Sequence, residues 1–180
     1  MNVFVYSLIV CIVICLMMIW YINIYNRYQN YIIRINEAEA NIDSTLRKRF
    51  DLLNKSIGII SSNTEENDVL KSISNLRSKK LTNFELDRKL YDAINEFNRY
   101  KEVHHDLKTN ESFMKIELGL NETEAEIVAA RKYYNDIITD YNKLVVTFPS
   151  NVVAKVSKYK TRTYFDGKNM EDDIVNDFKL

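Results

Sequence analysis

The pattern of hydrophobic and polar residues divides the chain into a short apolar start and a long amphipathic remainder. Residues 3–22 read VFVYSLIVCIVICLMMIWYI and contain no charged residue, glycine or proline. About twenty helical residues span roughly 30 Å, the thickness of one bilayer core. A cleaved signal peptide would need a basic start, a shorter apolar region and a small-residue cleavage site, and this run has none of them. The run predicts a retained transmembrane anchor within residues 1–24.

Charged and aromatic residues next to the run predict its orientation. Only Met1 and Asn2 precede it, whereas Arg27, Arg34 and the basic residues 47–49 follow it. The positive-inside rule then places the remainder of the chain in the cytoplasm and the N-terminus outside. Aromatic rings favour the headgroup region. They cluster where the run ends, at Trp20, Tyr21, Tyr25, Tyr28 and Tyr31.

Beyond the run, apolar residues recur at steps of three and four, which is the period of an amphipathic helix. The first such series is Ile32, Ile35, Ala38, Ile42, Leu46, Phe50, Leu53, Ile57 and Ile60. We expect it to continue the anchor helix to about residue 62. Asn63 with Glu66 then predicts a short second helix, which ends near Lys80.

Two further helices are predicted from capping residues. Thr82 and Glu85 form the pattern of a capping box, and we expect this third helix to reach about Leu107. Asn121 with Glu124 predicts the start of a fourth helix, which Pro149 ends. Its apolar series alternates in heptad steps, as in a coiled coil. The series is Ile127, Ala130, Tyr134, Ile137, Tyr141, Leu144 and Phe148.

Composition supports an all-α protein. The 180 residues include only three Gly and one Pro, too few for the turns of a sheet protein, and 46% are hydrophobic. Because most connections are short, we expect an antiparallel four-helix bundle over residues 25–165. The acidic segment 166–180 is predicted to be a loosely ordered tail.

The same composition excludes several functions. The three glycines lie too far apart for a phosphate-binding glycine-rich loop. The formal net charge is +0, so no overall basic field favours nucleic acid. Glu102 and His105 have the Glu-x-x-His spacing of di-metal bundles, but the required second motif is absent, and His104 is the only other histidine. We therefore expect no enzyme, no metal site and no cofactor.

Equal helical rise predicts which residues of the first and fourth helices face each other. If Phe148 lies level with residue 38, facing residue numbers sum to about 186. Asp43 would then face Asn142, and Asp51 would face Asn135, as interhelical polar contacts. The alternative is that these four side chains are solvated.

Two groups of residues are candidates for contacts at or within the membrane. Four cations follow Pro149, and an up-down bundle would bring them near anionic lipid, with a solvated segment as the alternative. They are Lys155, Lys158, Lys160 and Arg162. Three small side chains at i, i+4 and i+8 line one face of the span, and they predict a weak homodimer, with a monomeric anchor as the alternative. They are Ser7, Cys11 and Cys15, of which the two cysteines are too few for a zinc site.

Several stretches resemble the LemA family of bacterial membrane proteins. Residues 127–135 (IVAARKYYN), 140–142 (DYN), 147–149 (TFP) and 153–154 resemble the family signature around its last long helix. Further matches are the family's first cytoplasmic helix motif at 40–53, the stretch before the fourth helix at 106–113 and the aromatic–acidic ending at 164–166. The resemblance covers nearly the whole chain in order.

The resemblance implies a single span with an outside N-terminus at the bacterial inner membrane, a cytoplasmic antiparallel four-helix bundle and no established enzymatic activity. Three departures from the family pattern change the local expectation. Asn54 replaces a usual proline, so the associated kink should be absent. His104 and His105 replace a Tyr-Pro pair, so the third helix should run on. Lys158 and Tyr159 replace a glycine–aromatic pair, so this stretch should be less turn-like.

These observations predict a membrane-anchored scaffold or interaction protein. Its expected partners are the lipid bilayer and unidentified proteins, without nucleic acid. The alternatives are a lipid-contacting, membrane-organising module and a metal-binding bundle enzyme.

Overall fold

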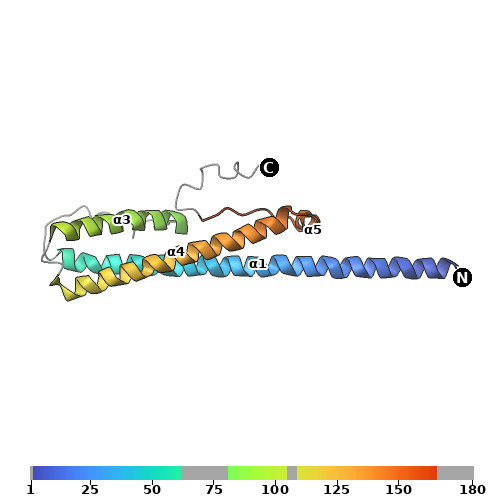
Figure 1. Cartoon of the computed structure of the whole chain (residues 1–180), viewed down its shortest axis with the longest axis horizontal. Helices are drawn as coiled ribbons and strands as arrows, with labels where there is room; N and C mark the ends of the chain where they lie inside the picture. The colour runs from blue at the N-terminus through green and yellow to red at the C-terminus, as the bar shows by residue number, and fades with distance from the viewer. Residues whose placement is uncertain (1, 62–80, 105–108, 166–180) are drawn as a thin grey trace. The chain divides into compact units, whose positions relative to one another are not determined.

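Helices make up the regular structure of this chain. A computed structural model describes residues 2–61, 81–104 and 109–165. Its elements are α1 (Asn2–Ser61), α3 (Asn83–Val103), α4 (Glu111–Val146) and α5 (Ser150–Ser157), and these described ranges contain no strand (Figure 1). The all-α prediction is confirmed. The predicted second helix at 63–80 and the predicted tail at 166–180 lie outside the described residues.

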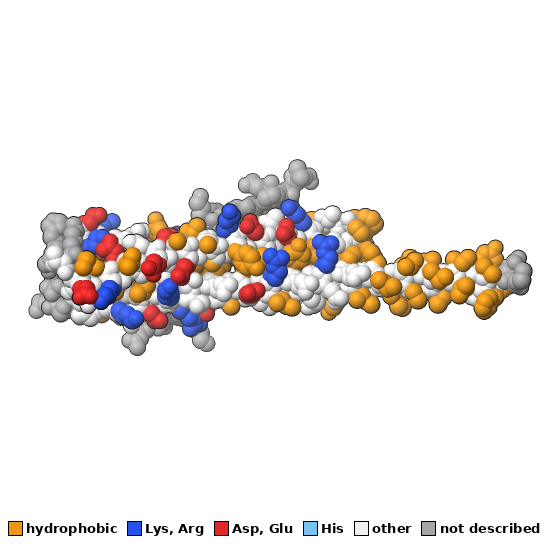
Figure 2. All heavy atoms as spheres, turned by 60° about the horizontal axis from the view of Figure 1, so that its bottom comes forward, with side chains coloured by type: hydrophobic (Ala, Val, Ile, Leu, Met, Phe, Trp, Pro, Cys, Tyr) orange, Lys and Arg blue, Asp and Glu red, His pale blue; other side chains and the backbone are white. Residues whose placement is uncertain are grey.

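Helix α1 has 60 residues and passes Asn54 without interruption, as the missing proline predicts. Of residues 3–22, all except half-buried Tyr21 are exposed, and hydrophobic side chains cover this part of the helix (Figure 2). Beyond it, most of the predicted stripe is buried. The buried members are Ile35, Ala38, Ile42, Leu46, Leu53 and Ile60. One helix therefore changes from an uncovered apolar rod to an amphipathic element.

Helix α3 begins as predicted but ends earlier. The Thr82 hydroxyl accepts the Glu85 N–H (3.3 Å), and the Glu85 carboxylate accepts the Thr82 N–H (3.0 Å), which completes the capping box. The prediction that the helix runs on to about Leu107 is wrong, because it ends at Val103. His104 leaves helical geometry, its N–H donates to the Tyr100 carbonyl, and its ring stacks on the Tyr100 ring.

Helix α4 begins ten positions earlier than the predicted start at Asn121. The Asn110 side chain accepts the Phe113 N–H (3.1 Å) and so caps a helix that starts at Glu111. Packing stabilises these additional N-terminal turns, because Phe113, Ile116 and Leu120 continue the apolar stripe and are buried. Gly119 is the exception within the stripe. A Cβ atom there would lie 3.1 Å from the Leu52 side chain, so the glycine permits a close approach of α1.

The chain turns after α4 and forms one more helix. Phe148 was expected as the last packed residue of the seam, but it lies beyond the helix and is 77% exposed. The Phe148–Pro149 peptide is cis. The sequence pattern predicts no helix here, because the eight residues of α5 are too few for a clear period. Lys158 ends α5 in the left-handed region (φ 57°), so the prediction of a less turn-like stretch is wrong.

The chain divides into two compact units, each described by itself. We call residues 1–37 with 135–164 the anchor unit, and residues 38–134 with 165–180 the core unit. In the core unit, Lys48 of α1 pairs with Glu126 of α4 (2.9 Å), and Leu52 lies against Gly119. Increasing numbers in α1 thus meet decreasing numbers in α4, and the two helices run in opposite directions.

The predicted register between α1 and α4 is wrong. A sum of about 186 would place a residue near 138 opposite Lys48, about twelve positions from its observed partner Glu126. The anchor unit has the same offset, because the Tyr28 hydroxyl bonds to the Leu144 carbonyl. The register was calculated from Phe148 as a packed residue, whereas Phe148 is exposed beyond the end of α4.

Candidate functional site

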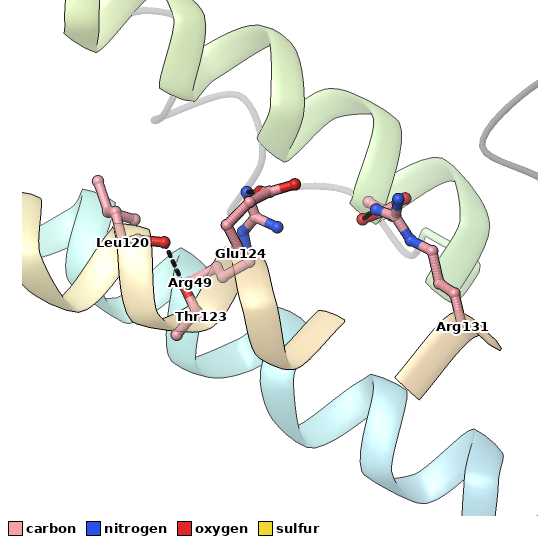
Figure 3. Close-up of polar contacts among 6 residues, drawn as sticks. Arg49, Leu120, Thr123, Glu124 and Arg131 are labelled. Carbon is pink, nitrogen blue, oxygen red and sulfur yellow. Dashed lines mark hydrogen bonds and ion pairs between the residues drawn. The ribbon is translucent and has the colours of Figure 1, made fainter. Parts of the chain in front are cut away.

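Arg49 is a buried cation in the core unit. Its side chain is only 3% exposed, and its guanidinium donates to the Glu124 carboxylate (2.5 Å), which is 49% exposed. Figure 3 shows Arg49 of α1 and Glu124 of α4 extending toward each other. The Arg49 Nε has no hydrogen-bond partner among the described residues. The pair therefore places one buried charge next to a carboxylate that water also solvates.

A cavity of about 190 Å³ lies beside this ion pair. Its polar lining comes from Arg49, Glu117, Glu124 and three asparagines, Asn95, Asn98 and Asn121. The two carboxylates are neutralised, since Glu124 pairs with Arg49 and Glu117 pairs with Lys101. A cavity of this size and polarity has room for a few water molecules. Its chemistry is that of hydrogen-bonding amides and paired charges, which suits hydration better than proton transfer.

A second buried ion pair joins α3 and α4 within the core unit. Asp87 is 5% exposed at its side chain and accepts a hydrogen bond from Arg131. Phe165 packs over this pair, with its ring 5.9 Å from the Arg131 Cζ atom. The same ring meets Phe84 and Tyr134 edge-on, at centroid distances of 5.9 and 6.2 Å. The aromatic residue of the family-like ending thus joins the packing of α3 and α4.

The anchor unit buries uncharged groups instead. The hydroxyl of fully buried Tyr28 donates to the Leu144 carbonyl (2.6 Å) and to the Ser150 carbonyl (3.2 Å). Tyr141 meets the Tyr28 ring edge-on, and Tyr159 packs against it at 4.6 Å. Burial raises the pKa of all three phenols above the ordinary value of 10.0, so each remains a protonated donor at neutral pH.

Further contacts fix α5 beside α1 where the apolar run ends. The hydroxyls of Tyr21 and Ser157 lie 3.3 Å apart, and Gln29 donates to the Tyr159 hydroxyl (2.7 Å). The Tyr25 ring lies 6.4 Å from that of Tyr159. Three of the five aromatic residues predicted as a headgroup belt, Tyr21, Tyr25 and Tyr28, therefore contact the C-terminal part of the anchor unit.

Two of the four predicted polar residues, Asp43 and Asn142, have partners other than those expected. Asp43 forms an ion pair with Arg47 one turn along α1 (2.7 Å), and Asp51 is exposed. The Asn142 side chain exchanges two hydrogen bonds of 2.8 Å with the Arg162 backbone. The Asn135 carbonyl accepts from Thr139 in the next turn. Asn142 thus fixes the segment that follows α5, a role that helix periodicity does not reveal.

The predicted lipid-contact residues lie together in the anchor unit. Lys155, Lys158 and Lys160 are exposed, whereas Arg162 is half-buried and its backbone is bonded to Asn142. In the apolar run, the Ser7 hydroxyl donates to the Phe4 carbonyl (2.8 Å). Cys11 and Cys15 are exposed thiols. The small-residue face therefore remains a prediction.

The described residues contain no cluster of three or more His, Cys, Asp or Glu side chains that could hold a metal ion. His105 of the Glu-x-x-His motif lies outside the described residues. The sequence reasoning missed the two buried ion pairs and the Tyr28 network. Arg49 gave a usable signal, because it lies three residues after Leu46 and four before Leu53 on the buried stripe.

Comparison with known proteins identifies the family. The model of the LemA family matches residues 38–178, a region that begins after the apolar run. A relative named Protein LemA, from Metamycoplasma hominis, is 30% identical over 138 residues, or 72% of this chain. The chain spans 60% of the length of that relative. The family model covers well over half of the chain, and the chain therefore belongs to the LemA family.

Proposed function

We propose that this protein is a single-pass membrane protein whose helices form an antiparallel bundle that serves as a scaffold for other proteins. In this proposal, the N-terminus lies outside the bacterial inner membrane and the bundle lies in the cytoplasm. The bundle carries out no catalysis and binds no cofactor.

One observation supports the anchor above all others. Among the described helices, α1 is long and apolar enough to cross a membrane, and its most apolar window is not buried at all. The large side chains of residues 3–20 stand between 38% and 82% exposed. An apolar surface of this extent is unstable in water and is stable in hydrocarbon. Since α1 continues beyond Ile24 with a buried stripe, the helix itself connects the anchor to the folded units.

The scaffold role is supported by what the core unit presents to solvent. The carboxylates of its cavity are paired with cations, which does not favour acid–base chemistry. Its exposed apolar side chains include Met114 (46%) and Leu118 (61%), one turn apart on α4. Such neighbouring apolar residues on a helix face are typical of contacts with a partner protein.

Alkaline extraction of native membranes tests the anchor. The full chain should stay in the membrane pellet, and a chain without residues 3–22 should be released. Release of the full chain would contradict the anchor. A reporter fused at the C-terminus checks orientation, and activity of that reporter outside the cytoplasm would reverse it.

Photo-crosslinking in native membranes tests the scaffold. A crosslinker at Leu118 should capture the same protein reproducibly, whereas one at exposed Lys132 on the same helix should not. Equal, unspecific capture at both positions would contradict a defined partner site. Stoichiometric iron, manganese or zinc in the purified full chain would instead favour the metal-binding bundle enzyme.

A further inference from the structure

Helix α5 lies at the depth where the apolar run of α1 ends. Its first residue, Ser150, bonds through its carbonyl to Tyr28, and its last residue, Ser157, lies next to Tyr21. Tyr28 is six residues beyond Ile22, which is about 9 Å along a helix. The headgroup region adds about 5 to 8 Å on each side of the hydrocarbon core. If residues 3–22 cross the bilayer, the Ser157 end of α5 lies in that region and the Ser150 end lies at its outer edge.

The outer face of α5 is apolar although its inner face already completes the packing. Val153 and Ala154 are buried at 0% and 2% exposure. Val152 and Val156, one turn apart, are 46% and 66% exposed, and Phe148 just before the helix is 77% exposed. These three side chains are therefore not part of the packing within the anchor unit. An apolar face at headgroup depth is typical of an interfacial membrane helix.

Charge complements this apolar face. Residues 141–165 contain five Lys or Arg and no Asp or Glu. The whole anchor unit has seven Lys or Arg against three Asp or Glu, although the complete chain has 25 of each. The neutral total therefore conceals a basic anchor unit and an acidic remainder. Exposed Lys155, Lys158 and Lys160 lie on α5 or directly after it, where they complement anionic headgroups.

We propose that α5 is a second membrane contact of this protein. Val152 and Val156 enter the interface of the leaflet in which the span ends, and Phe148 lies at the outer edge of that interface. Lys155, Lys158 and Lys160 bind the anionic phospholipid headgroups of that leaflet. The proposal rests on the proposed anchor, because the anchor brings α5 to the membrane. The bond between Tyr21 and Ser157 and the ring contact between Tyr25 and Tyr159 hold α5 beside the span.

Tryptophan quenching in the full chain tests this contact. The single native tryptophan, Trp20, reports the anchor, and a Trp20→Phe background carrying Val156→Trp reports α5. The matched control is Val128→Trp in the same background, because Val128 on α4 is 53% exposed in the core unit. Each chain is reconstituted in vesicles that contain phosphatidylglycerol and a lipid with bromine on its upper acyl chain. Circular dichroism checks that each variant keeps its helical content.

We expect brominated lipid to quench Trp20 and the probe at 156 by about twofold or more, and to leave the probe at 128 unchanged. In vesicles of phosphatidylcholine alone, or at high salt, quenching at 156 should fall. The triple change Lys155→Gln, Lys158→Gln and Lys160→Gln should reduce it in the same way.

The possible results separate the two proposals. If Trp20 is quenched but the probe at 156 is no more affected than the probe at 128, the α5 contact is overturned and the anchor is retained. The exposed face of α5 would then meet water or protein. Absence of quenching at Trp20 would overturn the anchor itself. Quenching at 156 that is equal in neutral lipid, at high salt and in the triple variant would overturn the role of the lysines.

Discussion

The anchor unit and the core unit differ in whether they bury charged groups. The anchor unit buries neutral groups, with the Tyr28 phenol and the Ser150 hydroxyl both bonded to the Leu144 carbonyl. The core unit buries charges as well as the neutral Ser56 and Thr123, with Arg49 at 2% and Asp87 at 4% exposure. The cations of the anchor unit stay mainly at its surface, where Lys155, Lys158 and Lys160 are exposed. Buried charges thus occur in the core unit, whereas the buried polar side chains described in the anchor unit are all neutral.

This difference predicts how each unit responds to the loss of one group. A buried ion pair that loses one partner leaves an uncompensated charge, at a cost of about 3 to 5 kcal/mol. A neutral hydrogen bond that is lost costs about 1 to 3 kcal/mol when its acceptor stays buried. Single substitutions should therefore damage the core unit more than the anchor unit.

The largest effect is expected for Asp87→Asn. This change removes the carboxylate that compensates partly buried Arg131, and we expect a loss of about 3 kcal/mol in the free energy of unfolding. Thermal unfolding of the full chain in detergent, followed by circular dichroism, measures this loss. Asp92→Asn is the matched control, since Asp92 is exposed on the same helix. Equal effects of the two changes would show that the buried pair has no special weight.

A smaller effect is expected for Tyr28→Phe in the anchor unit. The change keeps the ring contacts and removes only the hydroxyl that serves the Leu144 and Ser150 carbonyls, so the loss should be about 1.5 kcal/mol. Tyr91→Phe at an exposed position should cost nothing measurable. Amide hydrogen exchange locates the damage. Faster exchange confined to residues 38–134 would contradict a role for this hydroxyl in the anchor unit.

The sequence predicted the parts of the structure that depend on helical periodicity and local capping. The buried stripe of α1 and the capping box at Thr82 and Glu85 were both correct. Both are local, because each pattern repeats or closes within a turn or two of one helix. The predicted start of α4 was wrong for a related reason. Asn121 and Glu124 satisfy the capping pattern, but they lie in the middle of α4, whose buried residues begin before Asn121.

The candidate site depended on information that local patterns do not contain. Register between α1 and α4 depends on which residues pack, and one wrong assumption about Phe148 moved every predicted pair. The difference in net charge between the two units could be calculated only once the residues of each unit were known, because the net charge of the whole chain is +0. Helix α5 was missed because its eight residues are too few for a clear period.

Two stabilising substitutions would sharpen the contrast between the units. Lys158 holds a left-handed conformation that strains a side chain, so Lys158→Gly should raise the free energy of unfolding by about 0.5 to 1 kcal/mol.

Gly58 lies in α1 with open space where a Cβ atom would be added, so Gly58→Ala should raise the free energy of unfolding by a similar amount, about 0.5 to 1 kcal/mol. Gly119→Ala is the matched control, because the added methyl group meets Leu52 and should cancel the gain. Higher melting temperature in all three variants would contradict the close approach at Gly119.

The smallest effect concerns pH and belongs to the surface of the core unit. Hydrogen bonds from the Thr82 N–H and hydroxyl lower the pKa of the Glu85 carboxyl below the ordinary value of 4.5. A carboxyl with a lower pKa in the folded state stabilises the fold above its unfolded pKa, and this stabilisation is lost as the pH falls through the folded pKa. The start of α3 should therefore weaken below about pH 4.5.

Glu85→Gln isolates this contribution, because glutamine keeps an acceptor for the Thr82 N–H and does not titrate. Melting temperatures of the full chain and of this variant, measured from pH 7 down to about pH 3, should converge as the carboxyl of the native chain becomes protonated. The phenols of Tyr28, Tyr141 and Tyr159 in the anchor unit do not titrate in this range, since burial raises the pKa of each above 10.0. Acid sensitivity of this origin should thus be confined to the core unit. A constant difference between the two melting curves across the whole range would show that the capping carboxylate does not couple pH to stability.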